Sequence, residues 1–439
     1  MIAQSNEPAV FGSLAVMQRA LRAREISAAE LVDAVLRRIE RDEPKLSAWV
    51  EIAGDAAIAA ARTADVELPL GGIPFGVKDV IDVRGLPTRF GADLASPPAI
   101  FDAWCVAAAR RAGAIPIGKV QTTAFAYADP APTRNPWNVE RTPGGSSAGS
   151  GAVVGARQVP FAFGTQTGGS TLRPAAFNGV VGFKPTFGVI PTAGVGMLSP
   201  AFDTIGIISR DAGDATAVFG VYDARALQAA APRRPRLTSL LSYREDLCGP
   251  HVIAAIGAAL ERIRTGGAEV QPAAMPGLVD EVERLWRTVA AYEAHAAIAE
   301  AVASSKAGPA IRRLVDEGAK VNVAAYREAL ALRELLRAEL DELLASCDAV
   351  VLPAAGQVPE RSTAGNAHFL RPWSTCGFPS ISIPVGFDPD GMPMGMQIVA
   401  RRGADGELLA LARWAERAIA LENPGPRARL ERLPEKGMQ

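Results

Sequence analysis

Histidine and cysteine are scarce in this chain of 439 residues. There are only three histidines, His251, His295 and His368. The four cysteines form no close pair: Cys105, Cys248, Cys347 and Cys376. No cluster of histidine, cysteine and carboxylate residues has the spacing of metal ligands. We therefore expect reduced thiols, no disulfide framework and no metal site.

The chain also lacks net charge and long apolar runs. The formal net charge is −1, which gives no general electrostatic reason to bind nucleic acid or an anionic membrane. No uninterrupted apolar run reaches the ~18 residues that a transmembrane helix needs. Residues 1–8 show no basic region followed by an apolar stretch, so we expect no signal peptide and a cytoplasmic protein.

Helical and strand patterns alternate along the chain, which predicts an α/β fold with a covered, largely mixed sheet. A capping box at Ser27 and Glu30 opens a helix that we expect to end at Pro44. A short apolar run at 159–163 predicts a strand after a helix that begins just past Ser146. Apolar residues make up 49% of the chain, enough for one large core.

The middle of the chain differs in composition, because residues 232–347 are alanine-rich, charged and mainly helical in pattern. Helices are expected at 252–264, 281–305 and 322–346, and strands return at 349–353, 381–386 and 394–399. A last amphipathic helix runs from Gly406 to about Leu421. We predict one domain over 1–439, made of a catalytic core (1–230 and 348–422), a helical cap (232–347) and a peripheral tail (423–439).

Three segments combine a lysine and two serines with glycine-rich backbone. They are residues 76–79 (GVKD), 144–151 (GGSSAGSG) and 164–170 (GTQTGGS). None contains a histidine, so a serine nucleophile there needs another base. Lysine serves only when neutral, and its ordinary pKa of ~10.4 leaves roughly one molecule in a thousand neutral near pH 7.4. Lys78 follows an apolar run at 73–77, which is a route to burial and a lower pKa.

Gly168 and Gly169 have no Cβ atoms, so the backbone N–H groups from Thr167 to Ser170 are free to converge on one point. Converging amides there would stabilise the oxyanion that forms when Ser170 attacks a carbonyl.

These motifs resemble those of the amidase signature family. The resemblance covers roughly residues 10–220 and 349–420, and includes the serine–glycine stretch at 144–151 and the nucleophile stretch at 164–170. The two serines are 170 − 146 = 24 positions apart, as in the family. The family fold is a central twisted mixed sheet with helices on both faces, and the resemblance implies the same here.

The resemblance also implies the roles of the motif residues. Lys78 would be the base, Ser146 a bridging serine after a cis Gly145–Ser146 peptide, and Ser170 the nucleophile. The amides of Thr167, Gly168, Gly169 and Ser170 would form the oxyanion hole. The implied activity is hydrolysis of a carboxamide, or of a related ureide, carbamate or ester, without a cofactor.

The substrate pocket is expected to draw on the 125–140 loop, the helical middle region and residues 365–378. The candidate residues are Phe125, Tyr127, Gln166, Arg173, Asn366, His368, Trp373 and Cys376. Gln166 stands where family members often have aspartate, and Arg173 follows the nucleophile by three residues rather than two. Arg173 would bind a substrate carboxylate or pair with a core acid such as Asp203.

Other interpretations stay open. One is an amidotransferase subunit similar to the A subunit of glutamyl-tRNA amidotransferase, which would need a partner chain, although the short length and Gln166 argue against this. The segment 145–149 matches a nucleophile elbow, in which Ser147 would attack with Asp348 and His368 as an esterase. The family makes a homodimer a reasonable expectation. Lys119 after Gly118 has no following serine or threonine, so it is no P-loop lysine and is expected in a loop or at the surface.

Overall fold

The protein is described by a computed structural model that covers residues 10–92, 94–359, 363–423 and 425–426. Within these ranges eleven strands form one mixed sheet in the order β1-β3-β2-β4-β6-β5-β10-β11-β9-β7-β8. This confirms the predicted α/β class. The strands, in chain order, are β1 (Trp49–Ile52), β2 (Pro74–Lys78), β3 (Ile115–Val120), β4 (Phe161–Gln166), β5 (Val181–Lys184), β6 (Thr204–Ser209), β7 (Arg236–Ser239), β8 (Glu269–Pro272), β9 (Ala349–Pro353), β10 (Ser380–Phe387) and β11 (Pro393–Val399).

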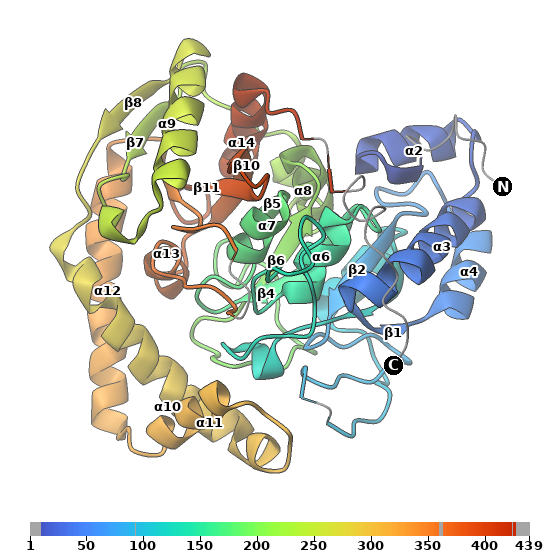
Figure 1. Cartoon of the computed structure of the whole chain (residues 1–439), viewed down its shortest axis with the longest axis horizontal. Coiled ribbons are helices and arrows are strands. Elements are labelled where there is room, and N and C mark those ends of the chain that lie inside the picture. Colours follow the sequence, from blue (N-terminus) through green and yellow to red (C-terminus); the bar gives the residue numbers. More distant parts are fainter. Residues whose placement is uncertain (1–9, 93, 360–362, 424, 427–439) are drawn as a thin grey trace.

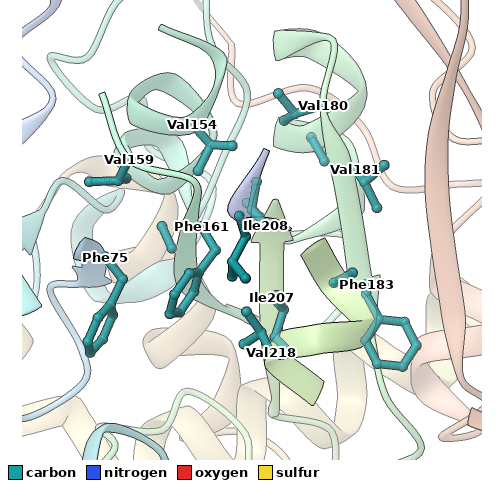
Figure 2. Close-up of a cluster of buried hydrophobic side chains, with 14 of the residues drawn as sticks. Phe75, Val154, Val159, Phe161, Val180, Val181, Phe183, Ile207, Ile208 and Val218 are labelled. Atoms are coloured by element: carbon teal, nitrogen blue, oxygen red, sulfur yellow. The ribbon is translucent and has the colours of Figure 1, made fainter. Parts of the chain in front are cut away.

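The centre of the sheet is buried on both faces. Strands β2, β4, β5 and β6 have no exposed residue, as expected for strands covered by helices on both sides. Figure 2 shows apolar side chains of these strands packed together, among them Phe75, Phe161 and Phe183. The rings of Phe75 and Phe161 stack with centroids 5.0 Å apart. This packing fixes the strand ends that carry the candidate site.

Helices cover the sheet on both sides (Figure 1). On one side, α6 (Ala148–Gly155) contacts β2 and β4, and α7 (Leu172–Asn178) contacts β5, β10 and β11. Another layer packs through contacts of α14 (Asp405–Ile419) with α8 (Ala212–Phe219) and α9 (Pro250–Thr265). The remaining helices near the amino-terminal half are α2 (Leu14–Arg22), α3 (Ala28–Leu46), α4 (Gly54–Arg62) and α5 (Trp104–Arg111).

The middle segment contains more than helices. Strands β7 and β8, which the sequence did not predict, extend the central sheet beyond β9. The other part is an arm of three helices at the lower left of Figure 1: α10 (Val282–Ala303), α11 (Pro309–Gly318) and α12 (Val323–Ala345). Range 232–347 is thus mainly helical, but its first part belongs to the sheet.

Several element boundaries differ from the predicted ones. The capping box at Ser27 is present, but α3 continues past Pro44 to Leu46. Proline has no backbone N–H, so the hydrogen bond to the carbonyl four residues earlier is lost, and the helix ends two residues later. The strand expected at 159–163 lies at 161–166. Of the predicted tail 423–439, residue 424 and residues 427–439 lie outside the described residues.

Candidate active site

Lys78 and Ser146 meet at the carboxyl end of β2. The Lys78 amine nitrogen lies 2.7 Å from the Ser146 hydroxyl oxygen and 2.7 Å from that of Thr165. Strand β4 carries Thr165 and runs parallel to β2, so both strands present side chains at the same sheet edge. The predicted contact between the lysine and the first serine is therefore present.

The environment of Lys78 favours the neutral amine. The side chain is 0% exposed. Burial lowers the pKa of Lys78 to about 7, while the Asp203 carboxylate raises it and the Arg173 guanidinium lowers it further. Asp79 does not reach Lys78, because it forms an ion pair with Lys119, and Asp82 accepts the Thr88 hydroxyl instead.

Lys119 is not the loop or surface residue expected from the sequence. It is fully buried, and its amine lies 2.9 Å from the Asp79 carboxylate and 2.8 Å from the Thr88 hydroxyl. The pair keeps the acid beside Lys78 in the chain away from the Lys78 amine. The charge of Asp79 is therefore balanced outside the candidate site.

The peptide bond between Gly145 and Ser146 is cis, as the resemblance implies. Three contacts surround this bond. The Thr123 N–H donates to the Ser146 carbonyl at 3.1 Å, the Gly145 N–H donates to the Ala364 carbonyl at 3.0 Å, and the Arg173 guanidinium donates to the Gly145 carbonyl. These partners fix the serine that contacts Lys78.

Ser170 lies between the end of β4 and the start of α7, and is 8% exposed. In the described part of the chain, none of the backbone N–H groups from Thr167 to Ser170 donates to another protein group, so all are available to a ligand. Asp203 accepts the Thr167 hydroxyl, and Trp286 donates its indole N–H to the Thr167 carbonyl at 3.2 Å. These two contacts fix the loop at Thr167.

No hydrogen bond joins the hydroxyls of Ser146 and Ser170 among the described residues. The backbone links the two segments instead, through the Ser147 N–H and the Ser170 carbonyl at 3.2 Å. Catalytic hydrogen bonds are often long in an empty site and tighten with substrate. Transfer of a proton between the two serines remains a prediction.

Gln166 does not face a pocket. Its side chain is fully buried, and its carbonyl oxygen accepts the N–H groups of Thr171 and Leu172 at 2.8 and 3.0 Å. Its amide donates to the Ser374 hydroxyl at 2.8 Å. These contacts satisfy free N–H groups at the start of α7, directly after the candidate nucleophile. The residue orders the Ser170 turn.

Arg173 does not pair with Asp203. Its guanidinium donates to the carbonyls of Asn366 and Gly145, and burial together with the nearby Arg371 lowers its pKa to about 9. Asp203 instead accepts the backbone N–H groups of Leu198 and Ser199. The arginine connects the cis peptide to the 363–369 loop.

The other predicted pocket residues divide into two groups. Trp373 and Cys376 are 0% exposed inside a hydrophobic cluster with Phe378, so they belong to the core and not to a pocket wall. Phe125 lines a cavity, and Tyr127 stacks on Trp286. His368 is part-buried, with its ring nitrogen 3.2 Å from Glu283.

The elbow interpretation has no triad geometry. The Ser147 hydroxyl donates to the Thr165 carbonyl at 3.2 Å and also accepts its N–H. Asp348 forms its contacts with Arg236, and His368 forms its own with Glu283. Ser147 thus fastens the start of α6 to β4.

Trp286 and Arg371 carried no sequence signal, and Thr165 and Asp203 make contacts at the site that the sequence did not predict. Arg371 lies 4.4 Å from the Trp286 ring and forms an ion pair with Glu283. A Cβ placed on Gly168 would lie 3.5 Å from the Arg371 guanidinium, so this cation lies beside the 167–170 loop. Only the folded chain brings these distant segments together.

Within the described ranges, no group of histidine, cysteine and carboxylate side chains is arranged to hold a metal ion. No described helix has the length and apolar character to cross a bilayer.

A family model described as Amidase matches residues 30–409. The chain belongs to this family. The A subunit of glutamyl-tRNA(Gln) amidotransferase from Symbiobacterium thermophilum is 31% identical, over 93% of this chain and 96% of its own length. This chain therefore covers nearly the whole length of that relative, so the expectation that its short length argues against a similar role is wrong.

Solved structures agree with this assignment. The structure described as an amidase has a TM-score of 0.85 at 29% identity, and covers 92% of this chain and 99% of its own. The structure of the A subunit of glutamyl-tRNA(Gln) amidotransferase from Thermotoga maritima has a TM-score of 0.76 at 27% identity, over 89% and 91% of the two chains. These likenesses confirm the twisted mixed sheet expected from the family resemblance.

Proposed function

We propose that this amidase cleaves a carboxamide C–N bond through an acyl-enzyme on Ser170. The Ser170 oxygen attacks the carbonyl carbon as its proton passes to Ser146, whose own proton passes to Lys78. Collapse of the tetrahedral intermediate breaks the C–N bond, and Lys78 returns its proton through Ser146 to the leaving amine. Water then attacks the ester by the same route, releasing the carboxylic acid and restoring Ser170.

The observation that carries this proposal is the buried amine of Lys78, 2.7 Å from the Ser146 hydroxyl. At a pKa of about 7, roughly 70% of Lys78 is neutral at pH 7.4, against about 0.1% at the ordinary value. A neutral amine is able to accept a hydroxyl proton. The four available amides at 167–170 support the same chemistry, because they match the need of an oxyanion for preorganised donors.

A second candidate is an amidotransferase A-type role, in which the ammonia released from an amide passes to a partner. The identity to the Symbiobacterium thermophilum protein over most of both chains favours it. The higher TM-score and fuller coverage of the amidase structure favour the independent hydrolase. Both candidates use the same acyl-enzyme chemistry and differ in amide donor and partner.

One experiment separates these possibilities. The purified chain alone is assayed for ammonia release from simple primary amides and from L-glutamine, and is treated with a fluorophosphonate probe followed by peptide mass mapping. We expect ammonia release and an adduct on Ser170, both absent from Ser170→Ala. An adduct on Ser147, or turnover retained in Ser170→Ala, would refute the mechanism. Turnover of glutamine only after a partner is added would favour the amidotransferase role.

A further inference from the structure

An apolar cavity of about 320 Å³ is lined by residues of the core and of helix α10. None of its eleven lining residues has a polar side chain. The core contributes Val80, Phe90, Leu94, Phe125 and the segment 195–198, and α10 contributes Ala297, Ile298 and Ala301. Ala297 is exposed, so the cavity reaches the surface at this helix.

Three of the walls are tied to the candidate catalytic groups. Val80 follows Lys78 by two residues, and its N–H donates to the Lys78 carbonyl at 2.8 Å. Phe125 follows Thr123 by two residues, and Thr123 donates to the Ser146 carbonyl. Leu198 donates its N–H to Asp203 at 2.6 Å, and Asp203 also accepts the Thr167 hydroxyl. None of the lining residues belongs to the segments of Lys78, Ser146 or Ser170, but these three walls are linked to those segments through hydrogen bonds.

The backbone at Phe125, one of the cavity walls, has an uncommon conformation. Phe125 and Ala126 have φ values of +50° and +58°, a region that residues other than glycine rarely adopt. Strain of this kind persists where surrounding structure imposes it, and it gathers at ligand sites. The Phe125 N–H donates to the Phe90 carbonyl at 2.8 Å, which fixes two aromatic wall residues together.

We infer that this cavity receives the apolar, uncharged part of the amide substrate, such as an aryl or branched alkyl group. This inference rests on the proposed function for the chemistry at Ser170. An apolar cavity of ~150 Å³ already holds a benzene molecule, so the volume here suffices for a phenyl ring with a short chain. An ammonium or carboxylate group would lose its hydration there without a partner, which disfavours a free amino acid.

The test compares 3-phenylpropionamide, acetamide and L-glutamine as substrates of the purified chain. Burying a phenyl group should raise kcat/KM for 3-phenylpropionamide over acetamide by about 10- to 100-fold. Equal kcat/KM values for the two amides, or a preference for L-glutamine, would overturn the cavity assignment while leaving the Ser170 chemistry intact.

Two neighbouring alanines on α10 provide matched variants, because both are exposed and only Ala297 lines the cavity. Ala297→Phe narrows the opening and should lower the ratio of kcat/KM for 3-phenylpropionamide to that for acetamide by about tenfold or more. Ala296→Phe should leave this ratio at its original value. Equal ratios in the two variants would contradict the assignment.

Binding to the Ser170→Ala protein, measured by calorimetry, removes the dependence on turnover. We expect 3-phenylpropionamide to bind at least about tenfold more tightly than L-glutamine. If this preference holds although the unmodified chain hydrolyses no amide, the proposed function is wrong and the cavity assignment stands. If acetamide is hydrolysed but the binding preference is absent, the cavity assignment is wrong and the proposed function stands.

Discussion

The neutral state of Lys78 makes the activity depend on pH in a defined direction. Activity requires the unprotonated amine, so kcat/KM should increase with pH and level off above the pKa of about 7. The neutral fraction is about 70% at pH 7.4, 9% at pH 6 and 1% at pH 5, from the ordinary titration relation. Log kcat/KM should therefore fall with a slope approaching one below pH 7, and kcat/KM should be about eightfold lower at pH 6 than at pH 7.4.

The assay is ammonia release at low substrate concentration between pH 5 and 9, on the unmodified chain and two variants. The Asp203 carboxylate raises the pKa of Lys78, so Asp203→Asn should move the acid limb to lower pH. Asp82→Asn is the matched control, because Asp82 accepts the Thr88 hydroxyl and should leave the limb in place. A limb that stays near pH 7 in Asp203→Asn, or a flat profile in the unmodified chain, would refute the reasoning.

Stability provides a second measurement of the same group. Between the folded pKa of about 7 and the unfolded value near 10.5, the unfolded chain binds more protons at Lys78 than the folded chain. The contribution of Lys78 to the free energy of unfolding therefore increases with pH in this window, by about 2 kcal/mol from pH 7 to 9. Lys78→Met removes this contribution. Between pH 7 and 9, the free energy of unfolding of the variant should therefore fall by about 2 kcal/mol relative to that of the unmodified chain, as measured by urea denaturation. A constant difference between the two proteins would show that the folded lysine is charged.

Three further variants test the surroundings of the site. Gln166→Ala should lower the free energy of unfolding by about 1–3 kcal/mol, because two buried N–H groups lose their acceptor. Gln166→Glu should restore much of this stability. An equal loss in both variants would contradict the assigned contact. Asp79→Ala should lower the free energy of unfolding, measured by thermal denaturation, by about 3–5 kcal/mol, because it leaves the Lys119 charge without its partner. The double variant with Lys119→Met should recover most of this loss. If it does not, the two residues are not coupled. Trp286→Phe removes the donor to the Thr167 carbonyl. Because one neutral hydrogen bond is lost, kcat should fall by about three- to tenfold with little change in KM. A change in KM alone would assign Trp286 to substrate binding.

Local motifs allowed the prediction of Lys78, Ser146 and Ser170, because each lies in a short segment whose glycines and order are informative by themselves. The structure brings the first two together as expected. Trp286 and Arg371 could not be predicted, since they come from segments without a motif and reach the site only through the fold. Asp203 was expected as a partner of Arg173, but it accepts the Thr167 hydroxyl instead. Trp373 and Cys376 lie near the candidate pocket residues in sequence, but their side chains are buried in the core. Sequence proximity does not reveal which way a side chain faces.

The missed strands β7 and β8 have a similar cause. Each has four residues, with only Leu237 and Val270 as apolar members outside proline. Strand β8 is the edge strand of the sheet and has a single buried residue, whereas β7 pairs between β8 and β9 but buries the polar residues Thr238 and Ser239 beside Leu237. The helices around them gave a stronger periodic signal, so the whole range read as a helical cap.

Helix α10 connects the two parts of the proposed function. The first part of α10 carries Trp286, which donates to the Thr167 carbonyl. The later part carries Ala297 and Ile298, which line the apolar cavity. A fold shared with amidases and amidotransferase chains does not fix the substrate, because function depends on the site built on that fold. Changes along α10 could therefore alter the bound amide while the Lys78–Ser146 contact stays the same. Under the proposed function, α10 is therefore the segment in which we expect substrate preference to be altered first.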